Sequence, residues 1–190
     1  MPKFFESKSP LSQKTDLIFE RTFKRYFDSL YNYGIKINAS EDVVKDSIQE
    51  VFFRIWKNGI NLSEVEYPKT YLMQALRHQI LNTLDLKYSR IIKIKLETDI
   101  AFVFSHEDYW IQNQEEEELR EKVVNALNLL SNKQREAVYL RYFEDLSFDE
   151  IAKIMNINLQ SVKNNVHRGL SVLRENMPLF LFMVLILKLN

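Results

Sequence analysis

The residues best suited to chemistry lie between Leu159 and Arg174, where amides, a hydroxyl and cations accompany an apolar stripe. This stretch contains three Lys or Arg residues and no acidic residue. Amides and hydroxyls can hydrogen-bond to base edges in the DNA major groove, and cations can contact phosphates. We therefore expect a DNA-binding helix. Its candidate contact residues are Ser161, Lys163, Asn164, Asn165, His167 and Arg168.

The sequence around this stretch predicts a helix-turn-helix over residues 146–174. Ser147 and Glu150 form a capping-box pattern at the start of the first helix. Asn156 can take the left-handed conformation in the turn, and Asn158 can cap the second helix. The buried stripe of that second helix is predicted to be Val162, Val166, Leu170 and Leu173. An ordinary solvated amphipathic helix is the alternative, because this geometry also occurs in proteins that bind no DNA.

Composition places the chain among all-α proteins. Of 190 residues 46% are apolar, Gly and Pro number only 3 and 4, and alternating Val/Thr-rich runs are absent from the sequence. We predict two helical domains joined by a flexible linker, the second a four-helix unit with the helix-turn-helix. The predicted divisions are 12–88 for the first domain, 89–114 for the linker, 115–176 for the second domain and 177–190 for an apolar tail.

The absence of cysteine excludes disulfides and thiol nucleophiles. His106 has no second His nearby, and the run 115–118 is better explained as the acidic start of a helix than as a metal cluster. We therefore predict no cofactor, no metal and no enzymatic activity. The first ten residues lack the apolar core of a signal peptide, so we expect a cytoplasmic protein.

Charge is unevenly distributed although the formal net charge is zero. Residues 69–95 hold six Lys or Arg and one acid, whereas residues 107–121 hold seven acids and one Arg. Local basic patches of this kind can still bind the phosphates of a nucleic-acid backbone.

Two helices of the first half carry further candidates. Residues 41–56 predict a helix with a buried stripe, and an exposed Phe53 beside acidic groups is either a partner-binding face or a solvated face with one stray aromatic. Residues 69–86 predict a helix whose aromatics, cations and amides suit unstacked bases and phosphates, although an ordinary basic surface would look similar. A helix over 16–33 precedes both, and we expect a turn over 34–40 with Ser40 as a cap.

The tail is unusual because residues 179–187 are all apolar. Nine residues are about half of the ~20 needed to span a bilayer. The tail could pack on the second domain, enter a partner's groove or lie at a membrane surface. We favour packing or partner binding, since an exposed apolar strip invites aggregation.

Taken together, these motifs resemble the bacterial RNA polymerase sigma factors of the sigma-70 type, specifically the small extracytoplasmic-function (ECF) class. The segment from Asp46 to Trp56 is similar to the family's D-x-x-Q-[ED]-x-F-x-x-x-W helix, and the segment from Tyr71 to His78 to its [WF]-L-x-x-x-x-R-N pattern. Residues 130–152 and the triplet 161–163 are similar to the LPxxxRxVFxL…LSxxEIA and T-V-K patterns. His78 replaces the usual Asn, Ser131 the usual Pro, and Gly169 the usual Ala.

The resemblance implies a factor that binds core RNA polymerase and directs promoter-specific initiation. Its first domain would dock on the β′ clamp helices, with further contacts to the β subunit, and would hold opened −10 DNA. Implied polymerase contacts are Asp46, Gln49, Glu50 and Phe53, with Phe52 and Trp56 as packing residues. Implied −10 contacts are Asn58 in the loop 57–68 and Lys69, Tyr71, Gln74, Arg77 and His78. Residues 161–168 would read −35 duplex DNA.

The resemblance also implies an anti-sigma partner, which in this class is often bound to the inner membrane, and a monomeric free factor. A stand-alone helix-turn-helix regulator, whose N-terminal half senses a signal or dimerises, is the alternative. An enzyme or metal protein that uses the His residues and the Glu run is a weaker alternative.

Overall fold

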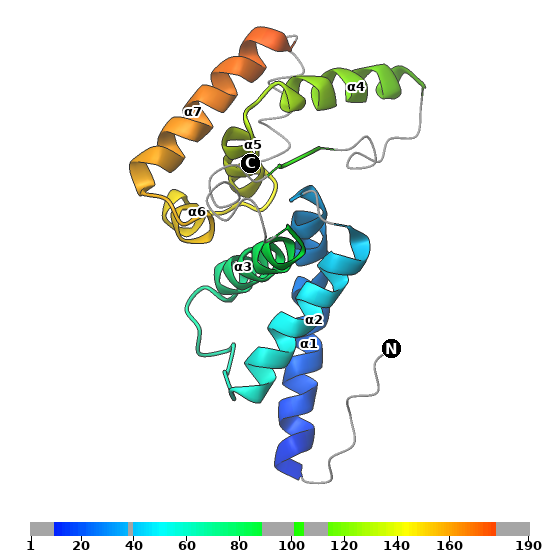
Figure 1. The fold of residues 1–190 in the computed structure, drawn as a ribbon, viewed down its shortest axis with the longest axis vertical. Helices are drawn as coiled ribbons and strands as arrows, with labels where there is room; N and C mark the ends of the chain where they lie inside the picture. Colours follow the sequence, from blue (N-terminus) through cyan, green and yellow to red (C-terminus); the bar gives the residue numbers. More distant parts are fainter. Residues whose placement is uncertain (1–9, 38–39, 89–100, 105–113, 178–190) are drawn as a thin grey trace.

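The computed structural model describes residues 10–37, 40–88, 101–104 and 114–177. Within this part of the chain all regular structure is helical, as the composition predicts. Figure 1 shows two groups of helices. The N-terminal group consists of α1 (Pro10–Lys36), α2 (Glu41–Lys57) and α3 (Pro68–Tyr88), which pack against one another. The predicted apolar stripe of α2 is buried, and it comprises Val44, Ile48, Val51, Phe52 and Ile55.

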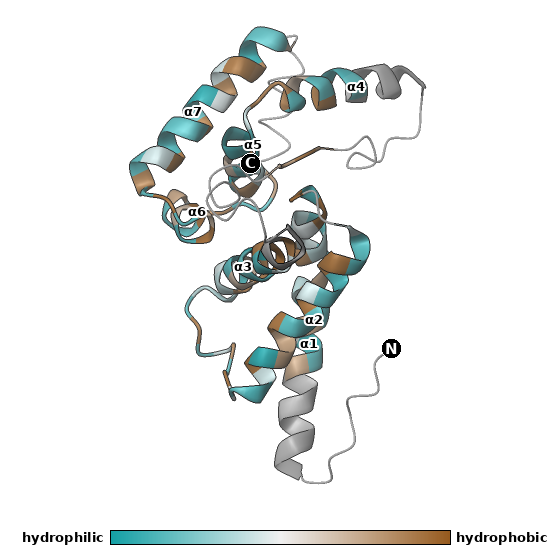
Figure 2. Ribbon diagram, in the orientation of Figure 1, coloured by the Kyte–Doolittle hydropathy of each residue, from teal (hydrophilic) through white to brown (hydrophobic). Residues whose placement is uncertain are grey.

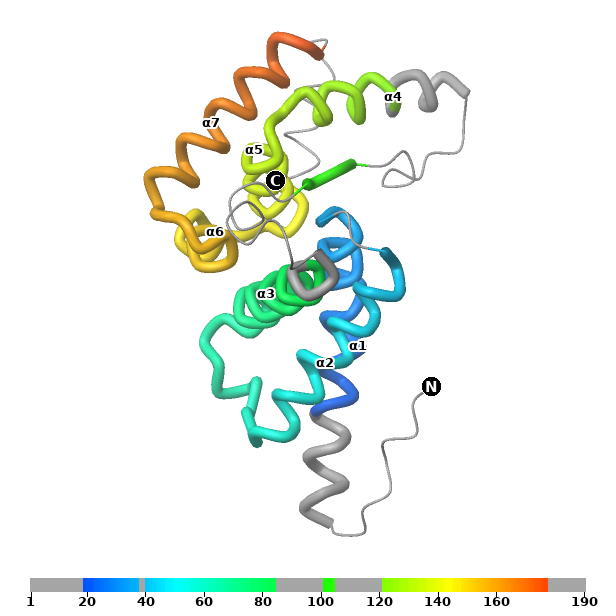
Figure 3. Tube along the Cα trace, viewed as in Figure 1, coloured from blue at the N-terminus to red at the C-terminus, as the bar shows by residue number. Residues whose placement is uncertain are grey.

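The C-terminal group consists of α4 (Gln114–Asn128), α5 (Asn132–Tyr142), α6 (Phe148–Met155) and α7 (Leu159–Asn176). Helix α7 packs on α4, α5 and α6, so the second half forms the expected four-helix unit around a helix-turn-helix. Figure 3 shows the path of the chain and places α6 above α3, and the two helices pack together. The N-terminal and C-terminal groups are therefore in direct contact.

Local polar groups define the helix ends as predicted. Ser147 and Glu150 form a reciprocal capping box, and the Ser147 hydroxyl accepts the Glu150 N–H at 3.3 Å. Asn156 lies in the left-handed region at φ 53°, and the Asn158 side chain accepts the Ser161 N–H at 2.7 Å. Ser40 stands at the N-cap of α2 but makes no side-chain capping bond. The turn geometry of the helix-turn-helix is thus encoded locally.

Gly34 differs from the prediction, because α1 continues through it to Lys36 instead of turning. A Cβ atom on Gly34 would lie 2.6 Å from Val44 Cγ1 of α2. The missing side chain lets α1 and α2 approach closely, so this glycine is a packing residue.

Gly169 in α7 has a similar role. A Cβ atom there would lie 2.9 Å from Val138 Cγ2 and 3.1 Å from Leu130 Cδ2. Since Val138 is buried and β-branched, it has little freedom to move away. The sequence comparison showed only that Gly169 stands where the family usually has Ala, whereas the structure shows that it sets the distance between α7 and α5.

An extended segment, residues 101–104, lies between the two helical groups and is coloured apolar in Figure 2. Phe102 and Phe104 are buried within it. Val103 N–H donates to the Lys36 carbonyl at 2.9 Å, and Arg135 Nη1 donates to the Phe102 carbonyl at 2.6 Å. This part of the predicted linker is therefore packed into the core and joins α1 to α5.

Several expectations concern residues outside the described ranges. His106 and the apolar tail 179–187 lie there, and so does most of the predicted linker. The acidic run 115–118 falls at the start of α4, as predicted, in a part whose side chains are not described.

We expect Gly169→Ala to lower the free energy of unfolding although alanine favours helices. The helix propensity gain is up to about 1 kcal/mol, whereas overpacking a core costs roughly 1–3 kcal/mol. Urea denaturation checks the sign. The Val138→Ala background removes the clashing methyl groups, so Gly169→Ala should there be neutral or stabilising. Equal effects of Gly169→Ala in both backgrounds would contradict the packing account.

Candidate nucleic-acid interface

The polar face of α7 is open to solvent. Lys163, Asn164, His167 and Arg168 are exposed, and Ser161 and Asn165 are half-buried. Gln160 Nε2 donates to Asn164 Oδ1 at 3.0 Å, which orders amides along this face. All six predicted contact residues thus belong to one helix whose opposite side is anchored by Val162, Val166 and Leu173. Such a face can enter a major groove.

The face of α2 opposite its buried stripe carries the other predicted group. Asp46, Gln49 and Phe53 are exposed, and half-buried Glu50 pairs with Arg54, whose Nε lies 2.6 Å from its Oε1. The prediction that Trp56 packs inside is wrong. Its side chain is 55% exposed and its ring centroid lies 6.3 Å from that of Phe53, itself 42% exposed.

Trp56 is exposed because it lies at the end of α2, one residue beyond Ile55, which is the last buried residue of the apolar stripe. Two large aromatics therefore form a ridge at the surface. Exposed neighbouring aromatics of this kind are typical of protein-binding sites.

The predicted contact residues of α3 fall into two sets. Asn58, which precedes the helix, and His78 are exposed, and Tyr71 is half-buried. By contrast, Lys69, Gln74 and Arg77 all donate hydrogen bonds to the C-terminal group. The structure brings these residues together on the face of α3 that meets the C-terminal group, where Arg77 is buried and Lys69 and Gln74 are half-buried.

Arg77 is the most deeply covered of the three. Its Nε donates to Glu136 Oε1 at 2.9 Å, and the Arg77 and Glu136 residues are only 7% and 2% exposed. The Tyr33 hydroxyl donates to the same carboxylate oxygen at 2.7 Å. Burial, followed by the negative charge of Glu136, raises the pKa of Tyr33 well above its usual range. A buried carboxylate of α5 is thus satisfied by two donors from the N-terminal group.

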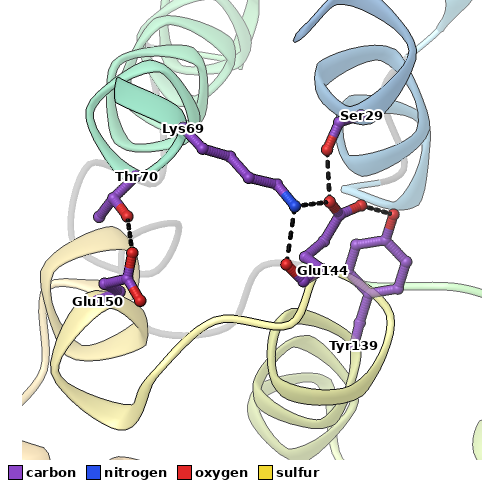
Figure 4. A network of polar contacts seen from close by, with 6 residues as sticks. All are labelled: Ser29, Lys69, Thr70, Tyr139, Glu144 and Glu150. Carbon is purple, nitrogen blue, oxygen red and sulfur yellow. Dashed lines mark hydrogen bonds and ion pairs between the residues drawn. The ribbon is translucent and has the colours of Figure 1, made fainter. Parts of the chain in front are cut away.

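Lys69 contributes to a second network, drawn in Figure 4. Its Nζ lies 2.8 Å from Glu144 Oε2 and donates to the Glu144 carbonyl at 2.7 Å. Glu144 also accepts hydrogen bonds from the hydroxyls of Ser29 and Tyr139. The backbone reverses direction just after Glu144, since Asp145 is left-handed at φ 53° and the Leu146 N–H donates to the Leu140 carbonyl at 3.1 Å.

A third contact joins α3 to α6. The Thr70 hydroxyl donates to Glu150 Oε1 at 2.7 Å, and Gln74 Nε2 donates to the Lys153 carbonyl at 3.0 Å. Burial raises the pKa of Glu150, but hydrogen bonds from Thr70 and Ser147 outweigh it, so the net pKa is lowered. Glu150 thus caps its own helix and holds α3 at the same time.

A pocket beneath the loop 57–68 adds residues that the sequence reasoning missed. It measures about 340 Å³, and its lining residues are Arg21, Thr22, Arg25, Tyr26, Leu62, Ser63 and Pro68. The guanidinium of Arg25 lies 5.4 Å from the centre of the Tyr26 ring. Arg21 and Arg25 lie one turn apart in an aromatic-rich helix, and this pair of cations is the sequence signal that points to the pocket.

Among the residues that the structure describes, no cluster of His, Cys, Asp and Glu side chains has the size that a metal site needs. Within the same residues, no helix is long and apolar enough to span a membrane.

Comparison with known proteins identifies the C-terminal group. Residues 120–173 match the family model described as "Sigma-70, region 4". The chain is 26% identical to the ECF RNA polymerase sigma factor SigX of Bacillus subtilis over 175 residues, which cover 85% of this chain and 84% of SigX. It is 24% identical to the RNA polymerase sigma factor YlaC of the same organism, over 83% of this chain and 91% of YlaC.

A solved structure shares the fold. The sigma factor RpoE of Bartonella quintana, in complex with the anti-sigma factor NepR, aligns with a TM-score of 0.56 and 22% sequence identity. The alignment covers 83% of this chain and 94% of RpoE. The helix-turn-helix matches sigma-70 region 4, and the chain is similar to sigma factors of the ECF class over most of its length. The resemblance predicted from the sequence is confirmed.

Glu150 yields a pH-dependent prediction. Because its pKa is lowered in the folded chain, its contribution to stability is present above its ordinary pKa of 4.5 and is lost as the pH falls through the lower folded value. Glu150→Gln should therefore lower the urea midpoint at pH 7, and this difference should disappear toward pH 3. Thr70→Val should remove part of the same pH dependence. A constant gap between wild type and Glu150→Gln over this pH range would contradict the assignment.

Proposed function

We propose that this protein binds core RNA polymerase in the cytoplasm and directs transcription initiation at promoters with −10 and −35 elements. The polymerase supplies the chemistry in this proposal, and the protein supplies position and sequence selection. The N-terminal domain, 12–88, would bind polymerase and the −10 element, and the C-terminal domain, 115–176, would bind the −35 element. The linker 89–114 would connect them inside the holoenzyme.

The aromatic ridge of Phe53 and Trp56 carries the polymerase part of the proposal. It stands on a helix whose other face is fully packed, so the ridge cannot be needed for the fold of its own domain. Asp46, Gln49 and Glu50 lie on the same helix and add polar partners. Burial of a paired aromatic ridge with polar groups at its rim is the usual composition of a binding hot spot. We propose the β′ clamp helices as its partner.

The open face of α7 supports the −35 part. Asn164 and Asn165 can pair with base edges, whereas Lys163 and Arg168 would mainly contact phosphates. The three Lys or Arg residues over 159–174 can contribute only a small electrostatic part of the free energy of DNA binding. We therefore propose that this domain binds duplex DNA weakly alone and depends on polymerase for affinity.

The loop 57–68 and the pocket below it support the −10 part. Arg21 and Arg25 offer positive charge, and Tyr26 and Pro68 offer flat apolar surface, to a base flipped out of opened DNA. Asn58, Tyr71 and His78 lie on the loop and on α3, which follows it. We propose that they extend this strand-binding surface.

We further propose control by an anti-sigma factor. The Bartonella quintana RpoE structure was solved in complex with such a partner. The apolar stretch 179–187 is a candidate contact for it, and the free factor would otherwise be monomeric.

In vitro transcription with core polymerase on a library of genomic fragments tests the proposal directly. A sigma factor makes core polymerase start at a defined set of sites sharing −10 and −35 sequences. A stand-alone regulator would add no defined starts to core polymerase, and that result would sink the proposal.

Two double variants separate polymerase binding from −35 recognition in the same assay. Phe53→Ala with Trp56→Ala should weaken core binding by about 30-fold or more, the loss expected for a hot spot of ~2 kcal/mol. Lys163→Ala with Arg168→Ala should leave core binding unchanged and reduce initiation at promoters that depend on the −35 element. Each pair is the control for the other, and the assignments fail if both variants lose the same property.

A further inference from the structure

Side chains of the C-terminal group hold the backbone of the extended segment. The Phe102 N–H donates to Asn132 Oδ1 at 3.2 Å, and the Phe102 carbonyl accepts a hydrogen bond from Arg135 Nη1 at 2.6 Å. Asn128 binds both backbone groups of Phe104, since its Oδ1 accepts the N–H at 3.4 Å and its Nδ2 donates to the carbonyl at 3.2 Å. The segment is therefore held through the backbone of alternate residues, as proteins hold an extended peptide.

Two aromatic side chains anchor the same segment. In an extended chain the side chains of residues i and i+2 point to the same side, and Phe102 and Phe104 are both buried. The ring centroid of Phe102 lies 5.5 Å from that of Tyr139, and the ring centroid of Phe104 lies 5.6 Å from that of Phe143. Val103 between them is 41% exposed. The site thus takes rings at positions i and i+2 and leaves the residue between them open.

The side chains of the C-terminal group that bind the segment all belong to residues 128–143, which form the α4–α5 corner. This corner also has hydrogen bonds of its own. Arg135 Nε donates to the Leu130 carbonyl at 2.7 Å, and Arg135 Nη1 lies 3.4 Å from Asn128 Oδ1. These bonds orient the guanidinium and the amide from within the corner. A site that is ordered before binding loses little entropy when it is filled.

The bound residues, 101–104, fall in the predicted linker 89–114 and in neither predicted domain. The chain thus supplies a tethered ligand to its own C-terminal group. Tethering by a short linker gives an effective concentration on the order of millimolar. A separate peptide must therefore match both aromatic anchors to compete for the corner.

We propose that the α4–α5 corner is a peptide-binding site for a partner protein. Its occupant is an extended segment with aromatic side chains at positions i and i+2, which replaces residues 101–104 of this chain. The chain's own segment defines this chemistry, because its backbone bonds and its two rings make the contacts. Arginine and aromatic side chains are the types that dominate binding hot spots. The inference does not depend on promoter recognition.

A fluorescein-labelled peptide with the sequence of residues 100–105 tests the proposal by fluorescence polarisation. Phe102→Ala with Phe104→Ala removes the anchors of the chain's own segment and vacates the corner. This double variant should bind the peptide at least about 10-fold more tightly than wild type, in which the tethered segment competes. Equal affinity of the two chains would overturn the proposal.

Matched substitutions on α4 assign the binding to the corner. Adding Asn128→Ala to the double variant removes two hydrogen bonds to the peptide backbone and should weaken binding by about 10-fold or more. Adding Asn125→Ala instead, at an exposed position of the same helix, should leave the affinity unchanged. Equal effects of the two substitutions would place the peptide elsewhere and contradict the assignment.

The peptide itself tests the predicted chemistry of the occupant. Replacing both of its Phe residues by Ala should abolish binding to the double variant, whereas replacing the Val between them by Lys should change the affinity little, because Val103 is exposed. Binding that survives the loss of both rings, or that requires the Val, would show that the corner does not select rings at positions i and i+2.

Wild-type protein provides a test that does not require the double variant to fold. A peptide with p-benzoylphenylalanine in place of Phe102, used at millimolar concentration, should form photocrosslinks beside Tyr33 and Tyr139, whose rings surround Phe102. Mass spectrometry locates the crosslinked residues, and excess unlabelled peptide should suppress them. Crosslinks confined to other helices would contradict the proposal.

A second copy of the chain is the other possible source of such a segment. In analytical ultracentrifugation, wild type mixed with the double variant should stay monomeric, because each wild-type segment remains in its own corner. A heterodimer that is lost when Asn128→Ala is added to the double variant would show that the occupant is another copy, and would overturn the assignment to a separate partner.

Discussion

The pairing of buried carboxylates in the C-terminal group with donors of the N-terminal group is the interaction on which this structure depends. Glu136 is 2% exposed and takes its hydrogen bonds from Arg77 and Tyr33, which belong to other helices. A buried ion pair is close to break-even against desolvation, whereas removing one partner costs about 3–5 kcal/mol. Such pairs favour one arrangement of the two helical groups without adding much net stability.

The same constraint explains how the chain can have no net charge and still be a DNA-binding protein. Its acids are not spread evenly over the surface, since Glu136, Glu144 and Glu150 face the cations and hydroxyls of α3. The two cations Lys69 and Arg77, which would suit DNA phosphates, are paired with Glu144 and Glu136.

Local features were predictable from the sequence, and contacts between distant segments were not. The capping box of Ser147, the left-handed Asn156 and the cap Asn158 follow from residues within four positions of one another. The glycine at 169 and the burial of Arg77 depend on α5, which no periodicity within α7 or α3 can reveal. Trp56 was misplaced because motif resemblance gives a residue type at a position, whereas exposure depends on where the stripe of α2 ends.

The distance between the two domains tests the central claim most directly. Spin labels at Asn32→Cys of α1 and Glu175→Cys of α7 occupy exposed positions, one on each domain, in a chain without other cysteines. Pulsed electron–electron double resonance should give one narrow distance distribution for the free chain. After core polymerase is added, the mean distance between the two labels should be clearly longer. The same distribution in both states would contradict the account, because the proposed −10 contacts Lys69, Gln74 and Arg77 of α3 would then stay paired with the C-terminal group in the holoenzyme.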